Sequence, residues 1–185
     1  AYISVINNFH NEFGNIHGFC NNAAATSGLG ELHSFSNTDF DKTLDLSFKM
    51  LWLSLKCEIQ YLTEKSLTAS IVNISSNAAL RGYANNSIYA ASKAAVNSLT
   101  LSAAKELGKK NIRINAISPG TILTPGVENY FEQEPNAEDY LKRSILLNRI
   151  GTPEDIGNAV SFLLSEDSKY IHGQVISIDG GSSIY

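Results

Sequence analysis

The most informative part of this chain runs from Ile71 to Ala95, and its sequence is IVNISSNAALRGYANNSIYAASKAA. It begins with a β-branched run over residues 71–74, which predicts a buried strand that ends at Ser75 and Ser76. A glycine-containing loop follows, and then an alanine-rich segment that predicts a helix. A strand that leads into a helix in this way indicates an α/β fold built on a parallel sheet.

Three side chains of this stretch, Ser76, Tyr89 and Lys93, form a candidate proton-transfer group. A Tyr and a Lys four residues later lie one turn apart on the same face of a helix. A free phenol has a pKa near ~10, which is too high for efficient proton transfer at neutral pH. A cation ~4 Å away contributes roughly 4 kcal/mol at an effective dielectric of ~20, or about three pKa units. Lys93 is therefore expected to bring the pKa of Tyr89 close to neutrality.

The Tyr-Lys pair also has an ordinary structural interpretation. Most pairs with this spacing are a half-buried aromatic ring beside a solvated amine. The neighbouring strand favours a functional interpretation here, because it delivers the Ser76 hydroxyl at its carboxyl end, where ligands bind in open α/β sheets. The sequence thus predicts that a phenol, an ammonium and a hydroxyl meet at one edge of the sheet.

Composition limits the class of protein and its partners. The chain has 185 residues, of which 43% are hydrophobic and 17% charged, so we expect one folded domain over residues 1–185 rather than disorder. The net charge is −4 and there is no basic run, which argues against nucleic acid or an anionic membrane surface as a partner. No apolar run approaches the ~20 residues of a membrane-spanning helix, so no membrane association is expected.

Cysteines, histidines and the first residues bear on compartment and metal binding. Cys20 and Cys57 lie in apolar runs, so they are expected to be buried free thiols of a reducing compartment. The first residues show no basic segment followed by a long apolar stretch, which predicts a cytoplasmic protein without a secretory signal. The four histidines have no metal-ligand spacing among themselves or with the cysteines, so no metal site is predicted.

Strand-like and helix-like segments alternate along the chain, which predicts a parallel sheet covered by helices. The helix that begins at Pro153 has a Thr152 N-cap and acids in its first turn. Residues 121–148 are expected to form an irregular, partly helical insertion. Strands are expected at 16–20, 71–75, 112–117 and 175–178, and helices at 1–13, 40–62, 87–107 and from Pro153 onward.

Five short motifs occur in order along the chain. They are Asn21-Asn22-Ala23-Ala24, Asn73-Ile74-Ser75-Ser76, Tyr89-Ala90-Ala91-Ser92-Lys93, Asn115-Ala116-Ile117-Ser118-Pro119-Gly120 and Ile178-Asp179-Gly180-Gly181. With these motifs, nearly the whole chain resembles the short-chain dehydrogenase/reductase family, of the classical type. The resemblance implies a Rossmann-like doubly wound parallel sheet with helices on both faces.

The chain departs from the family pattern at its start. The family opens with a strand, a Gly-rich turn and a helix whose amino end holds the pyrophosphate of a dinucleotide. No Gly-x-x-x-Gly-x-Gly occurs here, and the chain begins at what looks like the family's third helix. We therefore expect the first strands, about 60 residues at ~30 per βαβ unit, to be absent. We expect the chain to be a fragment of a longer protein, and a naturally truncated family member that pairs with another chain is the alternative.

The resemblance implies an NAD(P)-dependent oxidoreductase that acts on a small-molecule carbonyl/alcohol pair. Tyr89 would be the general acid in reduction and the general base in oxidation. Lys93 would lower the pKa of Tyr89 and bind the nicotinamide ribose, and Ser76 would orient the substrate oxygen. Ser47 stands where the family usually has an asparagine that holds a water next to the lysine, which puts that part of the proton relay in doubt. The cofactor, NAD or NADP, would contact Tyr89, Lys93 and the residues matched by motif, which are Asn22, Ala23, Ala24, the Ile74 backbone, Pro119, Gly120, Ile122 and Thr124.

The insertion over residues 121–148 is expected to be a substrate lid. It holds Tyr130, Phe131 and Tyr140 among acids, and lids of this sort close over a cofactor and set specificity. An ordinary surface loop with aromatic anchors is the alternative. The resemblance also implies a homo-oligomer, either a tetramer or a dimer. The alternative function is a truncated, non-catalytic family member that acts as a binding or regulatory subunit, which Ser47 and the missing Gly-rich turn would favour.

Overall fold

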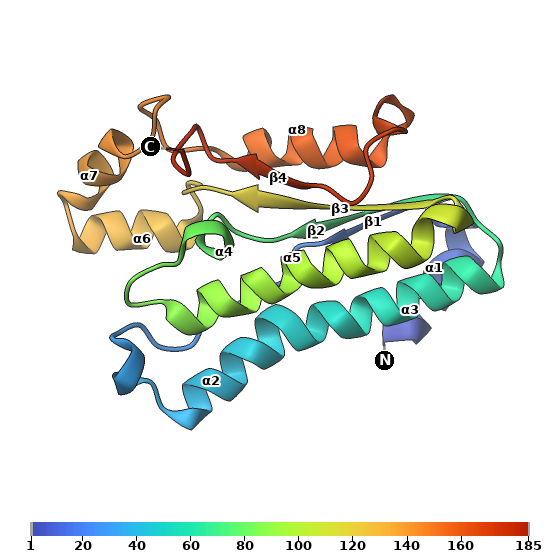
Figure 1. Cartoon of the computed structure of the whole chain (residues 1–185), viewed down its shortest axis with the longest axis horizontal. Coiled ribbons are helices and arrows are strands. Elements are labelled where there is room, and N and C mark those ends of the chain that lie inside the picture. Colours follow the sequence, from blue (N-terminus) through green and yellow to red (C-terminus); the bar gives the residue numbers. More distant parts are fainter. Residues whose placement is uncertain (1, 185) are drawn as a thin grey trace.

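A computed structural model of the chain describes residues 2–184, and its centre is a sheet of four parallel strands (Figure 1). The strands are β1 (Gly18–Asn21), β2 (Ala69–Ile74), β3 (Ile112–Pro119) and β4 (Val175–Ile178). They pair in the order β1-β2-β3-β4, so neighbours in the sheet are neighbours along the chain. The α-helices are α1 (Tyr2–Phe13), α2 (Asn37–Leu44), α3 (Met50–Glu64), α4 (Ala78–Arg81), α5 (Ser87–Leu107), α6 (Pro125–Gln133), α7 (Ala137–Arg143) and α8 (Pro153–Leu164).

The composition of β2 explains its central place in the sheet. All six residues of this strand are buried, as is typical of a strand covered on both faces. In the register of the sheet, Ile71 of β2 pairs with Phe19 of β1 and with Ile114 of β3. Paired residues of parallel strands point to the same face, so these three side chains form one apolar layer.

Helices cover both faces of the sheet (Figure 1). On one face α1, α3 and α5 pack over a buried cluster that includes Leu55, Ile71 and Val96. On the other face α8 packs its Leu163 against Val72 of β2. This arrangement confirms the predicted fold class, a doubly wound parallel sheet with helices on both faces.

Two helices begin at capping boxes. In α8 the Thr152 hydroxyl accepts a hydrogen bond from the Asp155 N–H, and the Asp155 carboxylate accepts one from the Thr152 N–H. Ser36 and Asp39 form the same reciprocal pair at the start of α2. Such caps satisfy N–H groups that have no partner within the helix. The N-cap predicted at Thr152 is thus confirmed.

The structure differs from the sequence-based expectation in three places. The helix expected over residues 40–62 is divided into α2 and α3 by a π-helical turn, Asp45–Lys49. A single-turn helix, α4, occupies part of the expected glycine-containing loop. The prediction that Cys20 is buried is wrong, because it lies near the carboxyl end of β1 beside a cleft and is exposed, whereas Cys57 is half-buried. Both cysteines are free thiols, as expected.

The carboxyl ends of the four strands meet at one edge of the sheet because all the strands run the same way. Figure 1 shows α4, α6 and α7 beyond that edge, with the strand arrows pointing toward them. The last two of these helices lie within residues 121–148, the segment expected to be a partly helical insertion. Within the part of the chain that the structure describes, no helix combines the length and apolar character needed to cross a membrane.

Candidate functional site

A cleft of about 700 Å³ runs along the carboxyl edge of the sheet, between the strand ends and the start of α8. We call it the sheet-edge cleft. It contains Ser76 and every residue predicted to contact a dinucleotide except Ala23. Its lining is Cys20, Asn22, Ala24, Ile74, Ser75, Ser76, Tyr89, Lys93, Pro119, Gly120, Ile122, Thr124, Pro153, Ile156, Gly157 and Val160.

The end of β2 is joined directly to the helix that carries the predicted proton-transfer pair. The buried Ser75 hydroxyl donates to the backbone oxygen of Lys93 at 3.1 Å. The adjacent Ser76 oxygen accepts a hydrogen bond from the Ala78 N–H at 3.1 Å, at the start of α4. The first bond fixes the strand end relative to α5, and the second fixes the Ser76 oxygen at the start of α4. Ser76, Tyr89 and Lys93 are therefore brought together in one cleft, as the sequence predicted.

Lys93 is a buried ammonium, with 2% of its surface exposed. Its Nζ donates to the backbone oxygen of Ile74 at 2.8 Å and lies 5.8 Å from the centre of the Tyr89 ring. Burial lowers the pKa of Lys93 to about 8. Because an ammonium has three donors, two remain unused by any acceptor among residues 2–184.

The pKa of Tyr89 is raised rather than lowered. Burial is the main cause, and the Ser76 hydroxyl opposes it. The expectation that Lys93 brings this phenol close to neutrality is therefore wrong for this structure. The physical reason is the direction of the Lys93 side chain, which gives its hydrogen bond to the end of β2 rather than to the phenol.

Ser47 does not reach the sheet-edge cleft. It is 1% exposed within the π-helical turn, and its hydroxyl donates to the backbone oxygen of Ala25 while accepting from the Ala25 N–H at 3.3 Å. This side chain thus holds the loop that follows Asn22 and Ala24. Ala23 lies in that same loop but does not line the cleft.

A buried chain of hydrogen-bonded polar side chains supports the end of β1, where the same loop begins. The motif analysis missed this chain. Glu58 of α3 is fully buried and accepts hydrogen bonds from Tyr2 Oη at 2.9 Å and from Asn21 Nδ2 at 3.1 Å. The Asn21 amide also donates to Asn73 Oδ1, and the Asn73 amide donates to Thr100. Burial raises the pKa of Glu58, although both donors oppose this shift.

A signal for this chain was present in the sequence. Leu51, Leu55 and Leu62 form the buried stripe of α3, and Glu58 falls on the same stripe at helical spacing. A carboxylate in an apolar stripe indicates a buried polar contact.

A second cavity, of about 360 Å³, opens from the sheet-edge cleft toward α6 and α7. We call it the lid cavity. It shares Ser76, Tyr89, Gly120 and Ile122 with the cleft. Gly120 itself is required by packing, since a Cβ there would lie 2.8 Å from Asp179 Cα. The lining of the lid cavity is Ser76, Asn77, Ala78, Tyr83, Asn86, Tyr89, Gly120, Thr121, Ile122, Val127, Tyr130 and Leu141.

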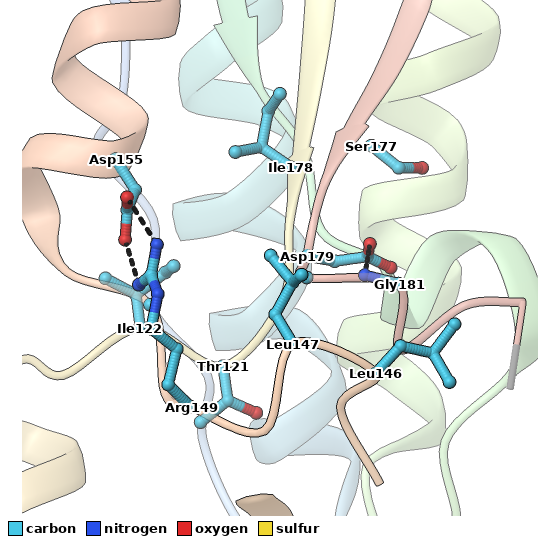
Figure 2. A pocket seen from close by; sticks show the side chains of 12 residues that line it. Thr121, Ile122, Leu146, Leu147, Arg149, Asp155, Ser177, Ile178, Asp179 and Gly181 are labelled. Carbon is cyan, nitrogen blue, oxygen red and sulfur yellow. Dashed lines mark hydrogen bonds and ion pairs between the residues drawn. The ribbon is translucent and has the colours of Figure 1, made fainter.

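The segment that carries α6 and α7 is anchored where it returns to the body of the protein. Figure 2 shows Arg149 facing Asp155, and the two join through hydrogen bonds of 2.7 and 2.9 Å. The Arg149 guanidinium holds the pKa of the Asp155 carboxyl well below its usual range. Beside this pair, Gly180 has φ of 62°, and a Cβ there would lie 2.6 Å from Ile145 Cγ2. The Asp-Gly-Gly motif thus makes room for the end of the 121–148 segment.

Comparison with protein families gives a match over almost the entire chain. A family model described as enoyl-(acyl carrier protein) reductase matches residues 2–183. Levodione reductase of Leifsonia aquatica is 39% identical over 176 residues, which cover 92% of this chain and 66% of the relative. The 3-oxoacyl-(acyl-carrier-protein) reductase of Thermotoga maritima is 37% identical over 170 residues, which cover 92% of this chain and 67% of the relative.

Solved structures share the fold of this chain. A structure of ElxO with NADP bound superimposes with a TM-score of 0.93 at 32% identity, over 100% of this chain and 74% of that one. The chain therefore spans about two thirds of the length of the two curated relatives and about three quarters of this structural neighbour.

Proposed function

Because this chain belongs to the classical short-chain dehydrogenase/reductase family, we propose that it forms the catalytic part of an NAD(P)-dependent oxidoreductase acting on a carbonyl/alcohol pair. One observation carries the proposal. Ser76, Tyr89 and Lys93 lie in a single cleft with nearly all of the residues expected to contact a dinucleotide. A non-catalytic binding subunit has no need of this grouping, so the alternative function is not favoured.

The chemistry of the cleft fits a nicotinamide cofactor. The two unused donors of the Lys93 ammonium suit the hydroxyl groups of a ribose. The cleft volume of about 700 Å³ lies within the ~300–1,000 Å³ typical of ligand sites. Asn22 and Ala24 would hold the side of the adenosine ribose, and the Ile74 backbone, Pro119 and Thr124 would hold the nicotinamide end. The NADP bound by ElxO supports this class of cofactor, and NAD and NADP both remain candidates.

Proton transfer is the part of the reaction that the chain itself performs. A bound NADH or NADPH supplies the hydride that reduces the carbonyl carbon. Tyr89 donates its phenolic proton to the carbonyl oxygen and accepts one from the alcohol in the reverse direction. Ser76 donates a hydrogen bond to the same oxygen and orients it. The Lys93 charge stabilises the phenolate that is left once the side chain turns from Ile74 toward the ribose and the phenol.

Residues 121–148 are the substrate lid of a single domain that extends over residues 1–185. The location of α6 and α7 beyond the carboxyl edge, and of Tyr130 in the lid cavity, supports this assignment. The Arg149–Asp155 pair and the close contact at Gly180 give the lid a fixed base. A surface loop without function would not need to line the cavity beside Tyr89.

The protein acts on a small molecule in the cytoplasm as a homo-oligomer. Its oligomeric state is supported by an exposed apolar stripe on the long helical segment, where Leu46, Met50 and Leu53 are 41%, 48% and 42% exposed. These residues are spaced four and three apart and so share one helix face. A dimer or tetramer formed through this face would bury the stripe.

The Tyr89→Phe substitution tests the proposed function. It removes the transferable proton and keeps the ring, so turnover should fall by about 10²–10⁴-fold while dinucleotide affinity stays within about threefold. Turnover is followed by NADH and NADPH absorbance, and binding by their fluorescence. Tyr170→Phe is the matched control, because Tyr170 is fully exposed and lies outside both cavities. A Tyr89→Phe protein with normal turnover would contradict the role of Tyr89.

A further inference from the structure

Tyr83, Tyr89 and Tyr130 are the only ionisable residues among those that line the lid cavity. None of its twelve lining residues is Asp, Glu, Lys, Arg or His. A carboxylate or phosphate that entered it would lose part of its hydration without meeting a cation from these walls, which is unfavourable. The wall composition therefore selects against charged molecules.

Three cationic side chains of the surrounding segments are engaged in other contacts. Arg81 donates to the backbone oxygen of Ser182. Lys142 pairs with Glu138 at 2.7 Å, and Arg149 pairs with Asp155. The lid segment itself carries an excess of acid, since residues 121–148 hold five carboxylates and two basic side chains. The electrostatic field around the entrance thus opposes anions as well.

The walls of the cavity favour an apolar, compact occupant. Val127 and Tyr130 come from one face of α6 and Leu141 comes from α7, while Ile122 closes the side next to the cleft. The amide of Asn77 is turned away from this space and donates to Ser182 Oγ at 3.0 Å. The volume of about 360 Å³ is near the lower limit of the ~300–1,000 Å³ usual for ligand sites.

We propose that the substrate of this site is an uncharged, compact ketone built on an alicyclic or aromatic ring, or the corresponding secondary alcohol. The inference rests on the proposed function, because it takes Ser76 and Tyr89 as the groups that meet the reacting oxygen. The ring lies against Val127, Tyr130 and Leu141. Molecules that carry a carboxylate or phosphate on the ring are disfavoured by the same walls, and acidic carriers are repelled by the excess of acid on the lid segment.

A matched pair of substrates tests the proposal with the full-length protein and its preferred dinucleotide. The compounds are 4-methylcyclohexanone and 4-oxocyclohexanecarboxylate, which share the ring and the reacting carbonyl and differ in one substituent. We expect kcat/KM to be about tenfold or more higher for the methyl compound, because the walls offer no cation to the carboxylate and the lid segment carries an excess of acid. Equal values, or a preference for the carboxylate, would overturn the proposal.

A substitution in the wall provides a second readout. Tyr130→Arg places a cation beside the ring and should reduce the preference for the methyl compound by about tenfold or more. Tyr170→Arg makes the same change at a fully exposed position outside the cavity and should leave the preference unaltered. If Tyr130→Arg does not fold, Val127→Lys serves as the second variant. An unchanged preference in a folded wall variant would contradict the assigned substrate position.

The result separates this inference from the proposed function. Turnover of charged ketones or acyl thioesters, with none of neutral cyclic ketones, would overturn the substrate class and leave the oxidoreductase activity standing. Absence of dinucleotide oxidation with every carbonyl compound, charged or neutral, would instead overturn the proposed function and the inference with it.

Discussion

The ammonium group of Lys93 is almost completely buried. The Ile74 carbonyl at 2.8 Å compensates that charge only in part, because a dipole replaces a full hydration shell. This is why the pKa of Lys93 falls to about 8 from the ordinary value of 10.5. The folded protein therefore binds this proton more weakly than the unfolded chain does.

The weakened proton affinity of Lys93 predicts how stability depends on pH. Above about pH 8 the folded protein loses the Lys93 proton, whereas the unfolded chain keeps it until its pKa of 10.5. Lys93 therefore raises the free energy of unfolding as the pH rises through this window. Relative to Lys93→Met, the wild-type protein should gain on the order of 2 kcal/mol between pH 8 and pH 9.5. Urea unfolding of both proteins in the absence of dinucleotide measures the difference. A constant difference across that range would mean that Lys93 has an ordinary pKa.

Ser47 offers a residue-scale test of how the Ala23–Ala25 loop is held. Ser47→Asn keeps one donor and one acceptor for the Ala25 backbone, so the fold should be unchanged and the turnover equal to or above that of the wild type. Ser47→Ala removes both bonds and should weaken dinucleotide binding by about tenfold, since a lost buried hydrogen bond costs ~1–2 kcal/mol. Dinucleotide fluorescence titration and steady-state assays compare the two variants. A large loss of turnover in Ser47→Asn would show that the serine has a function of its own.

At the scale of elements, Glu58 joins α3 to the ends of two strands. Its carboxylate meets only neutral donors, Tyr2 and Asn21, and burial raises its pKa. A carboxyl with a raised pKa favours the folded state below its ordinary pKa and loses this contribution as the pH rises and the group ionises. The negative charge of Glu58 therefore destabilises the folded state near neutral pH, whereas its hydrogen bonds do not.

Two substitutions of Glu58 separate these contributions. Glu58→Gln can keep a hydrogen bond to Asn21 and removes the charge, so its stability relative to wild type should improve as the pH rises from 4.5 toward neutrality. Glu58→Ala leaves the Asn21 amide without this partner and opens a cavity, which should lower the free energy of unfolding by about 3 kcal/mol. Denaturant titrations at several pH values measure both. An equal loss in Gln and Ala would mean that the negative charge itself is needed.

The elements that could be predicted are those whose pattern is local. The strands over 71–75 and 112–117 and the helix over 87–107 lie within one or two residues of their expected bounds because continuous apolar runs and helical periodicity define them. The π-helical turn at Asp45–Lys49 could not be predicted in this way. It accompanies the contact between Ser47 and the Ala25 backbone, a residue pair 22 positions apart, which no local pattern contains.

The candidate site could be predicted in membership but not in detail. A parallel sheet brings its strand ends to one edge, so motifs at three strand ends were bound to meet there. The direction of the Lys93 side chain could not be predicted. Attraction to Tyr89 competes with the hydrogen bond to the Ile74 carbonyl, and only the packed structure decides between the two. The Glu58–Asn21–Asn73 chain was missed since its members belong to three separate elements.

At the scale of the whole molecule, the stripe of Leu46, Met50 and Leu53 predicts self-association. An exposed charge in this stripe should disrupt it, so Leu53→Asp should shift the protein to a smaller species in analytical ultracentrifugation. Tyr170→Asp is the control, because Tyr170 is more exposed than any residue of the stripe. A monomeric wild-type protein, or an unaltered oligomer in Leu53→Asp, would show that this face is not the interface.

The match between strand order and chain order has a consequence for how this sheet is assembled during synthesis. Each of β2, β3 and β4 pairs with the strand made just before it, and among the strands of residues 2–184 none is inserted between two earlier ones. A chain that leaves the ribosome from its amino end therefore finds the docking edge for every new strand already made. The described part of the sheet grows in one direction, and a nascent chain that has reached β3 already contains the end of β2 and the helix α5, which bring Ser76 and Lys93 together.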